Sequence, residues 1–294
     1  MIIDTRFPIK GKLDGLRIWK SGDKTIAAVI KKDAKNPRTE GQMRQRIRMN
    51  NILGVYACIK TGLKENFEGI MGNKNAASFF RSYNLMRKAV WLTFRQKLYK
   101  QGVLAPYVIG QGKMPPIAYA FGEGAFTSDI SLGNLSITTD TTVDELARTI
   151  CEGNEGWGAG DTLQVMLLKQ RSNCSLGDST RDDADELWPI QSHILTLTLL
   201  PGCKDRLAQL APHEVAFPLE EMPAIANREG HLAVEVNGGD EYVYAFALVH
   251  GRGEGEKRLC SSQELVLSDT RMYETYTSDE ALERALTGYK PKRR

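Results

Sequence analysis

Residues 161–170 read DTLQVMLLKQ and residues 242–250 read YVYAFALVH, and both belong to a set of short candidate strands. The other members of the set are His193–Leu200, Glu214–Phe217 and Leu232–Val236. Turn-forming runs separate these strands: Glu152–Gly160, Pro201–Gly202, Asn237–Gly239 and Gly251–Gly255. Several short strands separated by turn-forming runs favour an antiparallel β-sandwich. Residues 242–268 are expected to form a hairpin that closes the sheet.

Further elements are expected on either side of this set. An N-terminal hairpin should pair Leu13–Trp19 with Thr25–Ile30 across a polar turn that contains Gly22. Additional strands are expected at Val103–Ile109 and Leu132–Thr138. Two short helices should follow capping residues, one at Val143–Ile150 with the capping box Thr142 and Glu145, the other at Ser278–Leu286.

Two longer helices are expected between the hairpin and the strands. The first should begin near Thr39, which with Gln42 makes a capping box, and its apolar stripe would be Met49, Ile52, Leu53, Tyr56, Ile59 and Leu63. The second, from about Ala76 to Leu98, would carry its aromatic residues on one face. Arg81, Lys88 and Arg95 recur every seven residues and would form a basic line beside that face.

Charge is distributed unevenly along the chain. Residues 1–113 contain 23 Lys and Arg and 7 Asp and Glu, whereas residues 114–294 contain 16 and 29. We therefore predict an α+β protein with two domains: a basic β-hairpin and helical region at 1–113, and an acidic β-rich domain with a C-terminal helix at 114–294. Such asymmetry indicates either binding to a polyanion or charge-complementary contact with another chain.

Composition and motifs exclude several classes of protein. The 294 residues are 41% hydrophobic and 26% charged, with no apolar run long enough to span a membrane. The charged N-terminus does not resemble a secretory leader. The five scattered cysteines suit a reducing compartment, and the four histidines lack metal-ligand spacing. Phosphate-loop, nucleophile-elbow and cysteine-protease patterns are missing. We expect no catalytic residue, no cofactor and no metal.

The run from Lys35 to Arg46, KNPRTEGQMRQR, carries a motif. Together with the hairpin before it, this motif resembles the KNPRT-box proteins, a group common in Bacteroidetes genomes. The resemblance continues through residues 82–85 and 108–112, and through 249–252 and 261–268. Related boxes occur in small proteins that look like products of phage structural gene modules. Glu40-Gly41 stand where Pro-Ala is more usual, and Gly41 weakens the helix start by up to about 1 kcal/mol relative to Ala.

The resemblance implies a non-enzymatic protein with a basic helical N-terminal part and an immunoglobulin-like β part. We therefore hypothesise a structural protein of a virion or phage-tail-like particle, cytoplasmic before assembly and particle-associated afterwards. Its partners would be copies of itself or other particle proteins, with nucleic acid as the alternative partner and no role for a membrane. The candidate interaction residues, which would grip a carboxylate or a phosphate, are Arg38, Arg44, Arg46, Arg48, Arg81, Lys88 and Arg95.

Overall fold

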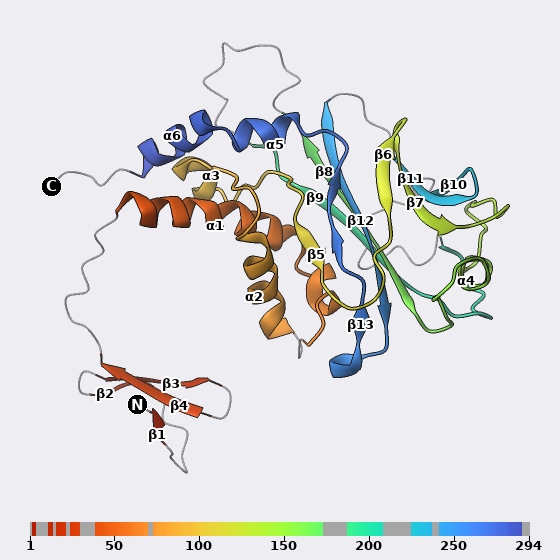
Figure 1. The fold of residues 1–294 in the computed structure, drawn as a ribbon, viewed down its shortest axis with the longest axis horizontal. Coiled ribbons are helices and arrows are strands. Elements are labelled where there is room, and N and C mark those ends of the chain that lie inside the picture. Colours follow the sequence, from red (N-terminus) through yellow and green to blue (C-terminus); the bar gives the residue numbers. More distant parts are fainter. Residues whose placement is uncertain are drawn as a thin grey trace. The chain divides into compact units, whose positions relative to one another are not determined.

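The protein contains both helices and antiparallel sheets and is an α+β protein (Figure 1). The structure, a computed structural model, describes residues 2–3, 11–13, 16–21, 24–29, 39–69, 73–172, 187–207, 225–236 and 241–289. These residues fall into two compact units, Met1–Thr39 and Glu40–Arg294. The expected strand at Glu214–Phe217 lies outside the described residues, as does Arg38.

The first unit contains a four-stranded antiparallel sheet in the order β1-β4-β3-β2. The predicted N-terminal hairpin is present as β3 and β4, which pair Leu16 with Val29 and Ser21 with Lys24. Ile18, Thr25 and Ala27 are buried. The strands are β1 (Ile2–Ile3), β2 (Gly11–Leu13), β3 (Leu16–Ser21) and β4 (Lys24–Val29).

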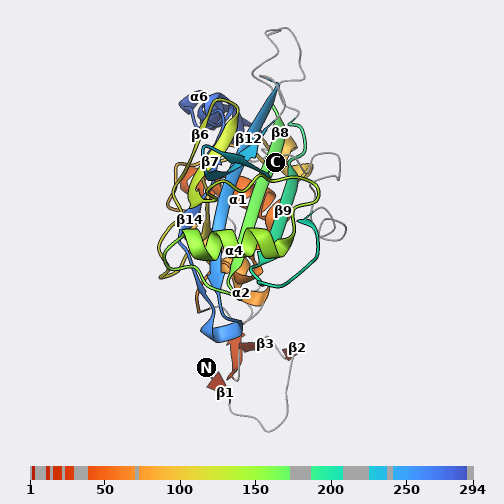
Figure 2. The same cartoon turned by 90° about the vertical axis from the view of Figure 1, so that its right-hand side faces the viewer.

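The second unit is built around a central antiparallel sheet in the order β13-β12-β8-β9, with β15 also paired to β12. Its long strands match the predicted runs: β8 (Thr162–Arg171), β9 (Gln191–Thr198) and β12 (Tyr242–Arg252). The short strands are β13 (Leu259–Cys260) and β15 (Val266–Leu267). Strands β8 and β12 are buried along most of their length because both faces of this sheet are covered (Figures 1 and 2).

One face of the central sheet packs against a second sheet, in the order β10-β11-β7-β6. Phe126 of this second sheet and Phe246 of β12 meet in the core between the two sheets. Helix α4 (Val143–Gly153) adds its buried side to the same core and begins at the predicted capping box. The strands are β6 (Tyr119–Gly122), β7 (Ala125–Ser131), β10 (Ile225–Arg228) and β11 (His231–Glu235).

The other face of the central sheet is covered by a helical layer (Figure 1). Its elements are α1 (Glu40–Ile59), α2 (Asn73–Asn84), α3 (Phe94–Leu98), α5 (Arg271–Tyr276), α6 (Asp279–Gly288) and the 3-10 turn Gly62–Glu65. Helix α1 begins directly after Thr39, and Ser278 caps α6, both as predicted. A two-stranded ladder of β5 (Val108–Gly110) and β14 (Gln263–Glu264) borders this layer, and the hairpin turn after β12 holds the 3-10 turn Gly255–Lys257.

The compact units meet at residues 39 and 40, whereas the predicted domain boundary lies at 113 and 114. The reason is that the helices share one core with the central sheet. Ile52, Val55 and Ile59 of α1 pack with Val243, Ala245 and Ala247 of β12. A boundary drawn from charge alone separates segments that fold together, because net charge acts on solubility and association and not on fold.

Buried amide side chains attach the segment between the helices and the sheet. Asn51 donates to the Val103 carbonyl at 3.0 Å and accepts from its N–H at 2.6 Å. Asn84 makes the same pair of bonds with Val108. Gln170 of β8 accepts from the Leu104 N–H and donates to the Gly102 carbonyl. These bonds replace strand pairing, so the expected strand at Val103–Ile109 is reduced to β5.

Two further expectations were wrong. Residues 132–138 form no strand, and the helix expected from Ala76 to Leu98 is interrupted after Asn84. The chain between α2 and α3 is irregular, and the Trp91 N–H donates to the Tyr276 carbonyl at 2.8 Å. Helix α3 then starts afresh, because Thr93 and Gln96 form a complete capping box.

The predicted apolar stripe is correct in part: Ile52, Ile59 and Leu63 are buried as expected, but the buried surface of α1 extends beyond the stripe. Leu53 is 45% exposed, whereas Met43, Ile47, Asn50 and Asn51 are buried. The cause is that α1 packs on two sides, with the sheet and α2 along one side and with α6 along another.

Candidate functional site

The predicted basic residues do not form one continuous surface. Arg44 and Arg46 are exposed on α1, where Arg44 pairs with Glu40 at 2.7 Å. Arg48 is half-buried, and its Nη2 donates to the Arg87 carbonyl. Arg44 and Arg46 therefore lie on the surface of α1, whereas Arg48 makes a structural contact.

The predicted basic line of Arg81, Lys88 and Arg95 is likewise divided among different elements of the structure. Arg81 lies on α2 and turns back on its own helix, where its Nε donates to the Ala77 carbonyl at 2.9 Å. Lys88 is exposed in the irregular segment, and Arg95 is exposed on α3. The interruption at Asn84 is what separates them.

In the second unit, basic and acidic residues are instead concentrated in different layers. Residues 40–107 contain twelve Lys and Arg and three Asp and Glu, and helices α5 and α6 add two and four. The layer on the opposite face of the central sheet, residues 118–161 and 225–236, contains two Lys and Arg and ten Asp and Glu. We call it the outer layer. One compact body therefore carries a basic helical layer and an acidic outer layer on opposite faces of its sheet (Figure 1).

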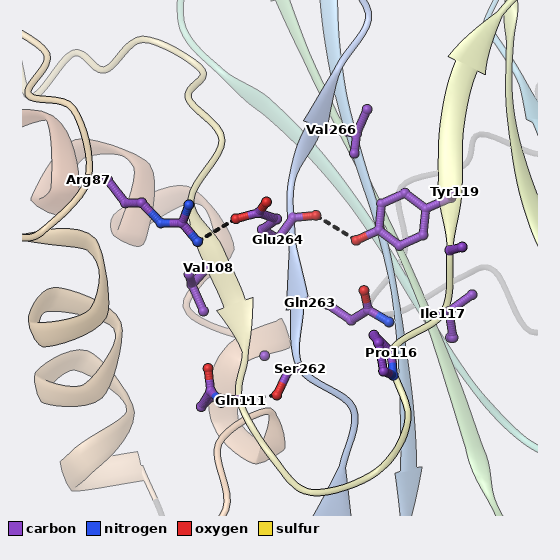
Figure 3. Close-up of a pocket in the computed structure, with 12 residues that line it drawn as sticks. Arg87, Val108, Gln111, Pro116, Ile117, Tyr119, Ser262, Gln263, Glu264 and Val266 are labelled. Carbon is purple, nitrogen blue, oxygen red and sulfur yellow. Dashed lines mark hydrogen bonds and ion pairs between the residues drawn. The ribbon is translucent and has the colours of Figure 1, made fainter.

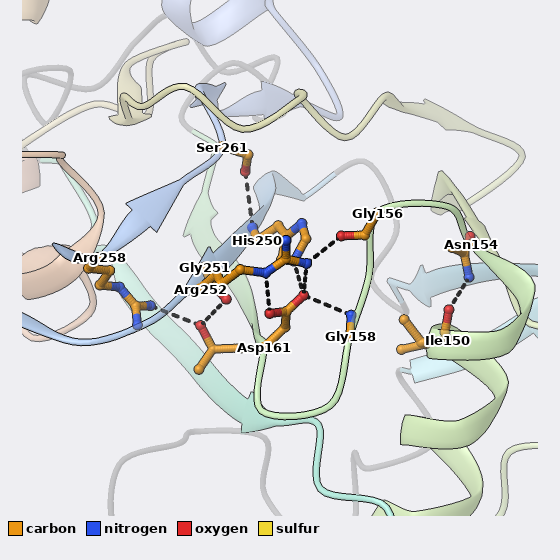
Figure 4. Close-up of polar contacts among 11 residues, drawn as sticks. Ile150, Asn154, Gly156, Gly158, Asp161, His250, Gly251, Arg252, Arg258 and Ser261 are labelled. Atoms are coloured by element: carbon orange, nitrogen blue, oxygen red, sulfur yellow. Dashed lines mark hydrogen bonds and ion pairs between the residues drawn. The ribbon is translucent and has the colours of Figure 1, made fainter.

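A buried polar cluster lies where β8 begins and β12 ends (Figure 4). The Asp161 carboxylate accepts from His250 Nε2 at 2.8 Å, from the Arg252 guanidinium twice at 2.7 Å, and from the Gly158 N–H at 2.9 Å. Trp157 stacks on the His250 ring with a centroid distance of 3.6 Å. The side chains of Asp161 and His250 are 3% and 5% exposed.

The cluster holds the loop between α4 and β8. Arg252 Nη2 donates to the Gly156 carbonyl as well as to Asp161, so one guanidinium fixes both ends of the loop. His250 and Asp161 are 89 residues apart in sequence, and sequence reasoning missed the pair. The spacing of His250 and Arg252 is a local signal, because residues i and i+2 of a strand share a face.

Burial and hydrogen bonding set the ionisation of the cluster. Burial alone would raise the pKa of Asp161, but hydrogen bonds from the guanidinium, the imidazole and a backbone N–H outweigh it and lower that pKa. Burial lowers the pKa of His250 below its ordinary value, and the neighbouring carboxylate only partly opposes this. The geometry thus favours a neutral imidazole that donates to an ionised carboxylate.

We expect the protein to lose stability as the pH falls from about 7.5 to about 5.5. His250 binds a proton more weakly in the folded state than in the unfolded state, whose pKa is about 6.5. Its stabilising contribution is therefore complete above that value and decreases below it. Urea unfolding of wild type and of His250→Gln at both pH values measures the effect. The pH-dependent change should be smaller in the variant, and equal changes in the two proteins would contradict the assignment to His250.

A groove of about 470 Å³ lies between β14 and the segment that leads into β6 (Figure 3). Its apolar floor includes Val108, Ile117 and Val266. Its polar groups bond with one another: Arg87 pairs with Glu264, and the Tyr119 hydroxyl donates to the Glu264 carbonyl. Glu264 thus bonds to Arg87 through its carboxylate and to Tyr119 through its backbone carbonyl.

Other chemistry-bearing residues are dispersed. His193 lies on β9 opposite Leu167, whereas His250 faces Leu163, four residues away along β8. Within the described ranges, no group of three His, Cys, Asp or Glu side chains is placed to hold a metal ion. Four cysteines are free thiols, Cys58, Cys151, Cys203 and Cys260, while Cys174 lies outside the described residues. Among the helices that the structure describes, none has both the length and the hydropathy for crossing a bilayer.

Comparison of the chain with protein-family models, with curated proteins and with solved structures found no match.

Proposed function

We propose that this protein is a non-enzymatic structural protein whose copies assemble head to tail through charge-complementary contacts. The observation that carries the proposal is the division of charge between the helical layer and the outer layer of one compact body. Because the central sheet separates the two layers, a copy cannot neutralise its own opposite faces. A heterologous contact with the next copy does so, and repetition of that contact generates rings or filaments.

We propose further that the assembly is a virion or phage-tail-like particle, which the protein joins after synthesis in the cytoplasm. The support is the box at residues 35–46 and its resemblance to proteins of phage structural modules. The exposure of Arg44 and Arg46 within that box suits contact with a carboxylate of a neighbouring subunit.

An immunoglobulin-like relationship for the two-sheet part belongs to the same proposal. In its favour, two antiparallel sheets share one core of alternating side chains. The helical layer on the far face of the central sheet is an addition to that architecture.

Binding of nucleic acid is the second candidate function. Exposed Arg44, Arg46, Lys88 and Arg95 favour it, since cations on an open surface attract phosphates. The acidic outer layer of the same body weighs against it, because that layer repels a polyanion.

Light-scattering mass of the full chain across a salt series tests the proposal. We expect large assemblies at about 20 mM salt that dissociate toward monomer at about 1 M, because salt screens contacts between exposed charges. Mixed-sequence DNA should leave the mass unchanged. An uncharged solute at matched osmolarity is the control and should not dissociate the assemblies.

A monomer at every salt concentration would contradict assembly. If that monomer binds DNA with an affinity that falls steeply with salt, the nucleic-acid function replaces it.

A further inference from the structure

The net positive charge of the chain is concentrated in its first unit. Residues 1–39 contain ten Lys and Arg and four Asp and Glu, whereas residues 40–294 contain 29 and 32. The first unit is therefore net positive and the second unit net negative. Contacts of cations with phosphates supply essentially all of the affinity of non-specific nucleic-acid binding, because they release the counterions that surround the polyanion. A polyanion is thus attracted to the first unit, while the net charge of the second unit repels it.

The sheet of the first unit presents an aromatic ring beside a cation on one of its faces. In β3 and β4, Arg17 pairs with Ala28 and Trp19 pairs with Ile26. Because cross-strand partners share a face, as do residues two apart on a strand, these four residues lie on the same face. Arg17 and Ala28 are exposed, Trp19 is 38% exposed, and Ile26 is half-buried. We call this surface the Trp19 face.

The dimensions of the Trp19 face suit an unpaired base and a nearby phosphate. Arg17 and Trp19 are about 7 Å apart along β3. Opposite Arg17, the methyl side chain of Ala28 rises little above the sheet, so a planar group can approach the indole. Every base has a π-face that stacks on an aromatic side chain, and a guanidinium binds phosphate through two parallel hydrogen bonds. A base stacked on Trp19 can therefore present a phosphate of the same strand to Arg17.

The exposed ring favours this ligand over other acidic partners. In a duplex the bases are stacked on one another, so a flat protein surface reaches mainly the phosphates. Binding to the surface of a membrane commonly uses an amphipathic helix, whereas the described elements of the first unit are strands. The residues that dominate protein interfaces lie in fully desolvated pockets, whereas Trp19 lies on an open sheet face. Stacking of an unpaired base needs only an accessible ring and a cation beside it.

We propose that the Trp19 face binds single-stranded nucleic acid, with a base stacked on Trp19 and a phosphate held by Arg17. The inference goes beyond the proposed function, because it assigns the first unit a ligand of its own. It also differs from the nucleic-acid function considered above, which uses exposed cations of the helical layer. Assembly through the second unit and binding through the first are compatible in one chain.

Fluorescence anisotropy of a labelled oligo(dT) of about 15 nucleotides tests the proposal with the full chain. We expect Trp19→Ala to weaken binding at least about fivefold, as loss of one stacked base does. Trp19→Phe should retain most of the affinity, because a phenyl ring still stacks. Arg17→Gln should weaken binding and reduce the slope of log affinity against log salt by about 0.7, the value for one phosphate contact on a single strand.

Tryptophan emission gives a second readout, which a folding defect in a variant does not reproduce. The chain contains four tryptophans, and Trp91, Trp157 and Trp188 belong to the second unit. Stacking of a base on Trp19 should quench part of the emission of the wild type. The same oligo(dT) should leave the emission of Trp19→Phe unchanged, although this variant still binds.

Two substitutions in the second unit are the matched controls. Phe94 is an exposed aromatic residue of α3, and Arg44 is an exposed arginine of α1. Phe94→Ala and Arg44→Gln should bind oligo(dT) like the wild type. A mixed-sequence duplex should bind at least about tenfold more weakly, because its bases cannot stack on Trp19. Binding of oligo(dT) or of oligo(rU) supports the proposal, and the ratio of the two affinities shows whether DNA or RNA is preferred.

Several results would overturn the inference. One is a wild type that binds vesicles of anionic lipid but not the oligonucleotides. Another is an equal loss of affinity in Arg17→Gln and Arg44→Gln, because the helical layer would then hold the strand. Quenching that persists in Trp19→Phe would place the stacked base elsewhere. If the wild type is a monomer at every salt concentration and still binds oligo(dT) through Trp19, the proposed function fails and this inference stands.

Discussion

Replacing Phe246 by Ala is expected to lower the free energy of unfolding by about 3–5 kcal/mol. Phe246 of β12 is 1% exposed and lies between the two sheets. Its ring centroid is 5.0 Å from that of Phe126 and 5.4 Å from that of Tyr119. The substitution removes these ring contacts and leaves a cavity that the flanking strands, each held by a ladder of hydrogen bonds, cannot close. Urea unfolding followed by circular dichroism measures the loss.

Phe94→Ala is the matched control for this prediction. Phe94 of α3 is 42% exposed and meets Tyr289 at one ring edge, so its removal should cost about 1 kcal/mol or less. Phe246→Leu should fall between the two variants, because it retains most of the buried volume. Equal losses for Phe246→Ala and Phe94→Ala would show that the two-sheet core does not dominate the stability of the second unit.

The elements that sequence predicted well are those whose signals are local. Strands β8, β9, β11 and β12 lie within one or two residues of their expected ranges. Thr142 and Glu145 form the expected capping box, with the Glu145 N–H donating to Thr142 Oγ1 at 3.3 Å. Long apolar runs and caps depend on neighbours in sequence, so they can be recognised without knowledge of the fold.

Two further features have local sequence signals but were not predicted. Thr93 and Gln96 form the same kind of box and mark the start of α3 inside the helix that was expected to be continuous. The hairpin of β6 and β7 turns at Glu123 and Gly124, whose φ angles are 49° and 79°. A two-residue turn with both angles positive is a standard hairpin connection, but Asn-Gly and Asp-Gly are its usual sequences. The sequence Glu123-Gly124 was therefore not recognised as a hairpin turn.

The remaining features depend on contacts between distant segments. Asn51 and Asn84 look like ordinary polar residues of amphipathic helices, and only the fold brings Val103 and Val108 to them. Residue counts along the chain showed basic and acidic regions. They did not show that these regions lie on opposite faces of one sheet. That placement depends on β12 pairing with β8, which lies some 80 residues earlier in the chain.

Replacing Asp161 by Ala is expected to lower the free energy of unfolding by about 3 kcal/mol. The carboxylate is 3% exposed and accepts hydrogen bonds from His250, Arg252 and the Gly158 N–H. Its removal leaves His250 Nε2 without an acceptor in a buried site and releases the loop from the start of β8. The unfolding free energy at about pH 7.5 measures the loss, since both partners have their folded ionisation states there.

Asp129→Ala is the matched control, because Asp129 is exposed on β7 and should cost about 0.5 kcal/mol or less. The Arg252→Ala variant provides a second test of the cluster. Arg252 is 46% exposed, and its loss leaves the buried carboxylate with a neutral histidine as its remaining side-chain partner. The pKa of His250 should then rise, because the guanidinium disfavours its protonation. An Asp161→Ala variant as stable as Asp129→Ala, or an unchanged His250 titration in Arg252→Ala, would show that the cluster does not hold the loop electrostatically.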